Sequence, residues 1–109
     1  MMRRVIALQG KDNKAREKYS REFIKGKSDK WVIICRDDLR NMMGDYWVPE
    51  REKLTVAMEY DSIATALEMG FNVIINHNNL NEGTIRKIRN IENILNKQIR
   101  LQIEFVTIT

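Results

Sequence analysis

The chain of 109 residues is 43% hydrophobic and carries a net charge of +4, a composition that is typical of one small folded domain and excludes a disordered chain. No apolar run approaches the roughly 20 residues of a membrane-spanning helix, and the single Cys35 excludes an intramolecular disulfide or a cysteine-based zinc site. The charge is uneven, because residues 1–30 hold ten Lys or Arg against four Asp or Glu, whereas residues 31–109 hold nine against eleven. A basic end favours either an anionic partner such as nucleotide or nucleic acid, or a solvated helix face.

Four apolar runs predict four β-strands. Three of them are continuous, as expected for strands that are covered on both faces. The last run alternates between apolar and polar residues, which is typical of a strand with one thinly covered face. The expected strands comprise residues 3–9, 31–35, 71–76 and 101–108.

Charged segments with apolar residues at helical spacing separate these strands and predict four helices. Asp12 or Asn13 is the expected N-cap of the first helix, and the long third helix is expected to bury an apolar stripe. The expected helices comprise residues 13–25, 36–44, 50–69 and 82–96. The expected stripe consists of Leu54, Ala57, Met58, Ala64 and Leu67.

The alternation of strands and helices predicts a parallel sheet with right-handed crossovers and helices on both faces. We expect one domain over residues 1–109. The apolar run at the N-terminus is too short for a signal peptide and favours a cytoplasmic protein with no membrane partner. The alternating last strand leaves a sheet edge at which we expect that a protein partner or a second copy of the chain can bind.

Polar segments follow the first three predicted strands. They comprise residues 9–16, 36–40 and 76–81. Because ligands of such sheets bind outside the carboxyl ends of the strands, we expect these segments to meet there and to form the functional site.

Three motifs occur in an order that resembles that of phage-type polynucleotide kinases, a family of P-loop kinases. They are Arg21–Ile24 in the first helix, Arg36–Arg40 after the second strand and Asn79–Asn81 after the third. The resemblance covers nearly the whole chain. It implies a three-layer α/β/α P-loop kinase-like domain with a four-stranded, mainly parallel sheet. It also implies ATP and Mg²⁺ as cofactors if the chain is active, with a 5′-hydroxyl of nucleic acid as the acceptor.

The phosphate-binding loop departs from the family's Gly-x-x-x-x-Gly-Lys-Ser/Thr pattern. Aligned without gaps, the second glycine is Ala15, the lysine is Arg16 and the hydroxyl residue is Glu17. A gapped alignment places Lys14 at the lysine position in a loop that is two residues shorter. The candidates that remain for binding nucleotide phosphate are Gly10, Lys11, Lys14 and Arg16. Because glutamate repels phosphate and offers no hydroxyl to Mg²⁺, we expect a degenerate loop.

The segment after the third strand also departs from the family, whose Asp-Asp-Thr-Asn-Leu becomes residues 76–80 of this chain. The acidic residues that help to organise Mg²⁺ in the family are missing, and we expect no metal ligands and no C-terminal lid. His77 is expected to be either a functional replacement or a polar loop residue. Tyr46 and Trp47 are expected either to stack on a base or to fold their loop onto the domain.

The segment after the second strand keeps the family's pattern. By resemblance, Asp37 is the catalytic base, and Arg40 contacts the acceptor or the transferring phosphate. The resemblance implies that substrate is bound by Arg36, Asp38 and Asn79. The residue types alone leave another interpretation, in which Asp37 or Asp38 caps the short helix and the two arginines form surface ion pairs.

Three functions follow from these observations. The first is a kinase-like protein with weak or no catalysis that binds nucleotide or nucleic acid. The second is an active ATP-dependent kinase on a polynucleotide or small hydroxyl substrate, in which Lys11, Lys14 or Arg16 replaces the missing lysine. The third is a non-catalytic module for protein interaction.

Overall fold

The computed structural model of this chain describes residues 1–27, 29–44, 48–77 and 80–108. Tyr46, Trp47 and Asn79, for which the sequence suggested roles, lie outside these ranges. Within the described residues, no helix is both long and apolar enough to cross a membrane.

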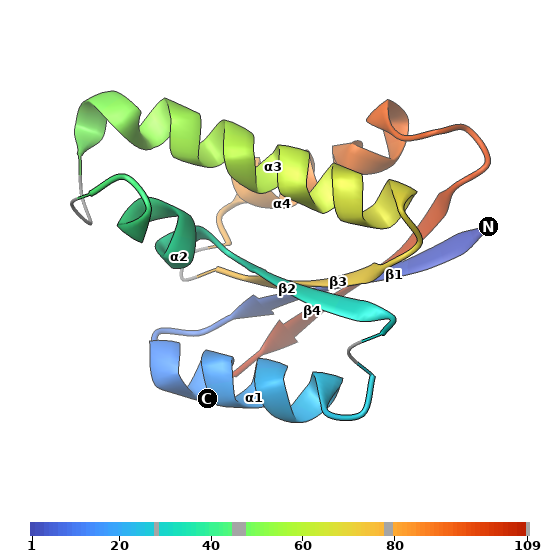
Figure 1. Cartoon of the computed structure of the whole chain (residues 1–109), viewed down its shortest axis with the longest axis horizontal. Helices are drawn as coiled ribbons and strands as arrows, with labels where there is room; N and C mark the ends of the chain where they lie inside the picture. Colours follow the sequence, from blue (N-terminus) through green and yellow to red (C-terminus); the bar gives the residue numbers. More distant parts are fainter. Residues whose placement is uncertain (28, 45–47, 78–79, 109) are drawn as a thin grey trace.

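A four-stranded sheet forms the centre of the molecule (Figure 1). Its strands are β1 (Met2–Gln9), β2 (Trp31–Cys35), β3 (Asn72–Asn76) and β4 (Arg100–Thr107). They pair in the order β2-β3-β1-β4, and every pairing is parallel. The predicted α/β fold with a mainly parallel sheet is therefore confirmed. Because β1 and β3 are the central strands, their residues can be covered on both faces.

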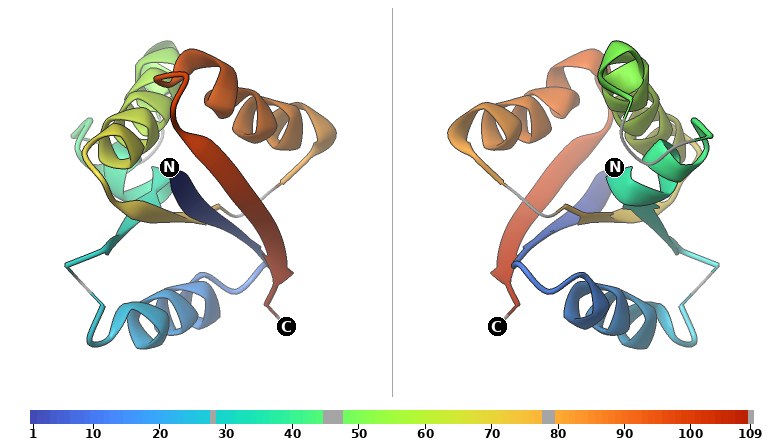
Figure 2. Two further views of the ribbon diagram at one scale, coloured as in Figure 1. Left: turned by 90° about the vertical axis from the view of Figure 1, so that its right-hand side faces the viewer. Right: turned by 90° about the vertical axis from the view of Figure 1, so that its left-hand side faces the viewer.

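The helices form a layer on each face of the sheet. They are α1 (Asn13–Ile24), α2 (Arg36–Asn41), α3 (Glu52–Glu68) and α4 (Glu82–Asn90). Helix α1 lies on one face, and α3 and α4 lie on the other, with α2 beside the start of α3 (Figures 1 and 2). Two short 3-10 turns, η1 (Pro49–Arg51) and η2 (Ile91–Ile94), precede α3 and follow α4. The predicted fourth helix therefore ends earlier than residue 96.

Each face of the sheet carries its own apolar core, because successive side chains of a strand point to opposite faces. Toward α3 and α4, Val5 and Ala7 of β1 pack with Ile63 and Leu67 of α3. Toward α1, Ile6 and Leu8 pack with Trp31 and the aromatic side chains of α1. The central strands therefore hold both helix layers on one sheet.

The buried face of α3 differs from the predicted apolar stripe. Leu54 is 53% exposed, and Ala57 is exposed as well. The residues that α3 buries are Thr55, Glu59, Ile63 and Leu67. The helix is turned so that Glu59 faces the interior, where it forms the ion pair described below.

Gly10 joins β1 to α1 at a point where backbones crowd together. Its φ angle is +153°, a value that residues with a side chain rarely adopt. A Cβ atom at Gly10 would lie 2.4 Å from the carbonyl oxygen of Ile108. The Ile108 N–H donates to the Gln9 carbonyl at 2.7 Å, which holds that backbone in place. Gly10 is therefore required for packing, whatever else it does.

We predict that Gly10→Ala lowers the free energy of unfolding by roughly 2–4 kcal/mol, the combined cost of a strained φ and an overpacked contact. Gly26→Ala is the matched control, since Gly26 also has a positive φ but no atom within 4 Å of an added Cβ. It should cost only about 1–2 kcal/mol. Urea unfolding measures the free energy of unfolding of both variants. Equal decreases would contradict the role assigned to the Ile108 contact.

Candidate functional site

The carboxyl ends of β2, β3 and β1 lie side by side, which brings the polar segments that follow them to one edge of the sheet. A polar cavity of about 80 Å³ opens there between α1 and the β2–α2 junction. Its lining includes Asn13 and Glu17 of α1, Asp38 of α2 and Asn76 of β3. This edge is where the sequence predicted the functional site.

The segment that the sequence predicted to bind phosphate has only three residues, 10–12, between β1 and α1. Helix α1 begins at Asn13, so that residues 13–17 are helical rather than part of a loop. Asp12 is the N-cap, and its carboxylate accepts hydrogen bonds from the backbone N–H groups of Lys14 (3.0 Å) and Ala15 (3.2 Å). A carboxylate of the chain therefore binds amide groups of the kind that hold phosphate at a helix N-terminus.

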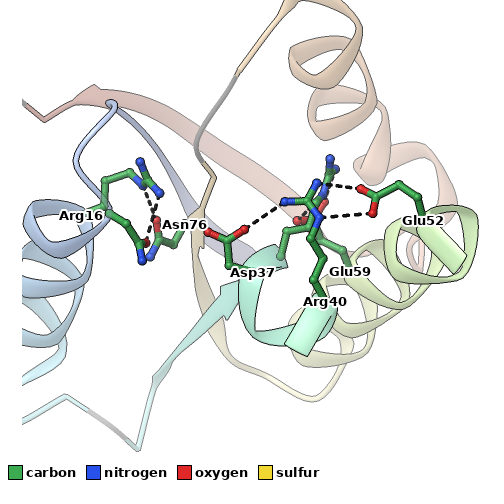
Figure 3. A network of polar contacts seen from close by, with 8 residues as sticks. Arg16, Asp37, Arg40, Glu52, Glu59 and Asn76 are labelled. Atoms are coloured by element: carbon green, nitrogen blue, oxygen red, sulfur yellow. Dashed lines mark hydrogen bonds and ion pairs between the residues drawn. The ribbon is translucent and has the colours of Figure 1, made fainter. Parts of the chain in front are cut away.

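Arg16 turns inward and fills the space behind this loop. Its side chain is 1% exposed, and its Nε donates to Asn76 Oδ1 at 2.7 Å (Figure 3). The same guanidinium donates to the Gly10 carbonyl and, at 3.1 Å, to Asn13 Oδ1. These contacts join the loop, α1 and the end of β3. Arg16 thus acts as an internal crosslink and does not project toward solvent as a phosphate-binding side chain would.

Arg36, the first residue of α2, is paired with a buried carboxylate of α3. Its Nε and Nη2 donate to the two carboxylate oxygens of Glu59 at 3.1 and 2.7 Å. The Glu59 side chain is 1% exposed and that of Arg36 is 14% exposed. A two-point pair of this kind fixes the orientation of both side chains as well as their distance.

Arg40, one turn further along α2, lies between two carboxylates. It donates to Glu52 at 3.2 and 2.7 Å and to Asp37 Oδ1 at 2.9 Å (Figure 3). The hydrogen bond from Arg40 holds the pKa of Glu52 below its usual value. Asp37, the predicted base, and Arg40, the predicted phosphate contact, therefore touch each other within one ion-pair network.

The residue pattern did not identify the α3 carboxylates Glu52 and Glu59 as part of the site. Arg36 and Arg40 are four residues apart, and Glu52 and Glu59 are seven apart, so each pair lies on one face of its helix. Opposite charges at these spacings on consecutive helices were the signal that could have identified the pairs. The arginines do form ion pairs, as one interpretation of the sequence held, but the pairs are largely buried. Among the described residues, no side chain caps α2, so neither Asp37 nor Asp38 has the capping role.

His77 is buried beneath the same network. Its side chain is 5% exposed, and burial lowers its pKa to about 4, with further repulsion from Arg36 and Arg40. His77 is therefore neutral at pH 7. It occupies the position after Asn76, which is itself 4% exposed. Neither side chain offers the anionic oxygen that Mg²⁺ prefers.

The other predicted residues lie apart from this network. Lys11 and Lys14 are exposed, whereas Asp38 lines the polar cavity. Within the described ranges, no three His, Cys, Asp or Glu side chains are grouped so that they could hold a metal ion. Glu17 supplies no hydroxyl and Asn76 no charge, so the residues present do not fit a Mg²⁺–nucleotide complex.

Solved structures of known proteins share this fold. A chain of the Pnkp1/Rnl/Hen1 complex matches 98% of this chain with a TM-score of 0.79 and 23% sequence identity. A chain of the Pnkp1/Rnl/Hen1 RNA repair complex matches 93% of it with a TM-score of 0.72 and 23% identity. A "putative kinase" from Chloroflexus aurantiacus matches 98% of it with a TM-score of 0.75 and 16% identity. These matches support a kinase-like fold.

The chain is shorter than the proteins that it resembles. It spans 36% and 32% of the two repair-complex chains and 59% of the Chloroflexus protein. No protein-family model matches the sequence, and no curated protein matches it.

We predict that Glu59→Gln lowers the free energy of unfolding by about 3 kcal/mol, because it leaves the charge of Arg36 largely buried without a counterion. Glu17→Gln is the control, since the Glu17–Arg21 pair is exposed, and it should cost about 0.5 kcal/mol or less. Urea unfolding at neutral pH measures both variants. A Glu59→Gln loss as small as that of the control would contradict a structural role for the ion pair.

His77 should make the protein less stable as the pH falls from 6.5 toward 4. In that range the unfolded chain binds a proton at His77 (ordinary pKa 6.5) while the folded chain does not. The unfolded state therefore gains stability as the pH falls.

Between pH 7 and pH 5.5 we expect a loss of about 1 kcal/mol that is absent from His77→Gln. Urea unfolding of the wild type and of His77→Gln at the two pH values measures this difference. The carboxylates are the same in both proteins, so the difference between the two pH dependences is due to His77. Parallel pH profiles would show that His77 titrates normally in the folded state.

Proposed function

We propose that this chain is a kinase-like domain that binds nucleic acid or nucleotide and transfers phosphate from Mg²⁺–ATP weakly or not at all. The observation that carries the proposal is the closure of the phosphate-binding loop by the chain's own groups. The Asp12 carboxylate binds the amides at the start of α1, and the Arg16 guanidinium fills the space behind them.

Both groups oppose the binding of a triphosphate. A phosphate at the start of α1 would have to displace Asp12 and break its hydrogen bonds, or remain beside a like charge that repels it. To reach that phosphate, Arg16 would have to break its hydrogen bonds to Asn76 and Gly10. The buried amide oxygen of Asn76 would then lack its hydrogen-bond donor. The loop therefore favours its closed arrangement.

On the acceptor side, the arginines that would contact phosphate are already paired with carboxylates of the chain. The residues that resemble the family's acceptor motif are present, but Arg36 and Arg40 already hold Glu59 and Glu52. Their charges are largely neutralised before any ligand arrives. Asp37, bound to Arg40, is held in place as a hydrogen-bond acceptor, which suits a group that orients a hydroxyl.

Nucleic acid is the ligand class that the observations favour. Residues 1–30 carry ten basic and four acidic residues, and one of the structural matches is a chain of the Pnkp1/Rnl/Hen1 RNA repair complex. The resemblance of Arg36–Arg40 to the acceptor motif of polynucleotide kinases points to the same class.

One observation favours an active kinase as a second candidate. Because α1 begins at Asn13, Lys14 lies in its first turn, where the gapped alignment places the motif lysine. Lys14 is exposed and could swing toward a phosphate. In that case Lys14, and not Arg16, would supply the positive charge.

We predict that labelled ATP transfers no more phosphate to a 5′-hydroxyl oligonucleotide with the wild type than with Asp37→Ala, and that Mg²⁺–ATP does not bind measurably by calorimetry at millimolar concentration. Rapid multiple turnover that Asp37→Ala abolishes would overturn the proposal. If Lys14→Ala also abolished that turnover while Lys11→Ala did not, the active kinase with Lys14 in the lysine role would be established instead.

A further inference from the structure

Helix α1 carries a row of positive charges on its outward face. The row consists of Lys14, Lys18 and Arg21 of α1 and of Lys25, the residue that follows the helix, at intervals of four, three and four residues. At about 100° per residue these positions share one face of a helix. The opposite face holds Arg16 and Ser20, which are buried against the sheet. We call these four residues the α1 row.

The lysines of the α1 row form no ion pair within the part of the chain that the structure describes. Among the described residues, no carboxylate lies within 4 Å of the Nζ atom of Lys14, Lys18 or Lys25, and Arg21 has only an exposed partner, Glu17, at 3.3 Å. In contrast, both arginines of α2 hold carboxylates of α3. The excess charge of the basic end is therefore left on this face.

The position of α1 leaves the row open to a large partner. Figures 1 and 2 show α1 on the face of the sheet opposite to α3 and α4, with its outer side turned to solvent. Lys27 and Lys30 extend the positive charge beyond the end of the helix, and both are exposed. The row runs from Lys14 to Lys25, which is roughly 16 Å of helix.

We propose that the α1 row binds the phosphate backbone of a nucleic-acid strand without reading its sequence. Lysine is a flexible point charge, and a row of them recognises charge spacing rather than base edges. Phosphates of one strand follow each other every roughly 3.4 Å along a duplex, so the row spans several of them. Arg21 also lines the polar cavity beside Asp38, so a strand lying on the row passes the edge that holds the acceptor motif.

A lipid surface fits the same row less well. Helices that lie in a membrane interface set large apolar side chains beside their basic face. Here the row is flanked by Glu17 and Glu22, and the apolar residues of α1 pack on the sheet. The inference rests on the proposed function for its ligand class and is independent of whether ATP is used.

The test compares two variants with the same loss of charge. Lys18→Gln/Lys25→Gln removes half of the row, and Lys53→Gln/Lys97→Gln removes two exposed lysines elsewhere, one of them on α3, on the other face of the sheet. Binding of a fluorescein-labelled single-stranded oligonucleotide of mixed sequence is measured by anisotropy over a series of salt concentrations. Thermal unfolding confirms that each variant is folded.

For the wild type we expect the logarithm of the association constant to fall with the logarithm of salt with a slope of about −3, as four phosphate contacts on a single strand imply. In the row variant the slope should fall to about half and the affinity roughly twentyfold near 0.1 M salt. The Lys53/Lys97 variant should behave like the wild type.

Equal weakening in both variants would overturn the assignment of the row while leaving nucleic-acid binding, and so the proposed function, in place. Absence of any binding by the wild type at low salt would overturn both. Row-dependent binding to phosphatidylserine vesicles that exceeds binding to the oligonucleotide would replace nucleic acid by a lipid surface. Rapid ATP turnover that Asp37→Ala abolishes would overturn the proposed lack of strong catalysis and leave the assignment of the row in place.

Discussion

The ion pair between Arg36 and Glu59 is the contact on which the arrangement of the candidate site depends. Glu59 is almost completely buried, and an unpaired carboxylate in that position would cost several kcal/mol or would have to bind a proton. Helix α3 is therefore turned so that Glu59 faces Arg36 of α2, and the apolar Leu54 is left exposed. That rotation places Glu52 beside Arg40, and Arg40 in turn holds Asp37. One buried charge thus orders the side chains of Arg36, Asp37 and Arg40.

A second arginine has a comparable effect on the other side of the site. Arg16 links the loop after β1 to the end of β3 through polar groups that carry no formal charge, while Asp12 closes the start of α1. Guanidinium and carboxylate groups that a phosphotransferase would direct at its substrates are here directed at each other. The lysines on the outer face of α1 form no ion pair among the described residues. Their positive charge is therefore left on the surface of the molecule.

Several features of the structure followed from residue patterns alone. The strands and the parallel sheet were predictable, because continuous apolar runs separated by helices allow few topologies. The buried side of α3 was not predictable from apolarity, because Glu59 and Thr55 replace Leu54 and Ala57 on it. A glutamate is expected at the surface, and the burial of Glu59 is explained only by its ion pair with Arg36 of α2.

The sequence by itself determined the fold class and the excess charge of residues 1–30. These properties depend on residue type and on short spacings along one element. Only the tertiary structure decided where Arg16 points, which carboxylates neutralise Arg36 and Arg40, and which lysines remain without a counterion. Each of those outcomes joins residues from different elements, and their distance is set by how the helices pack on the sheet.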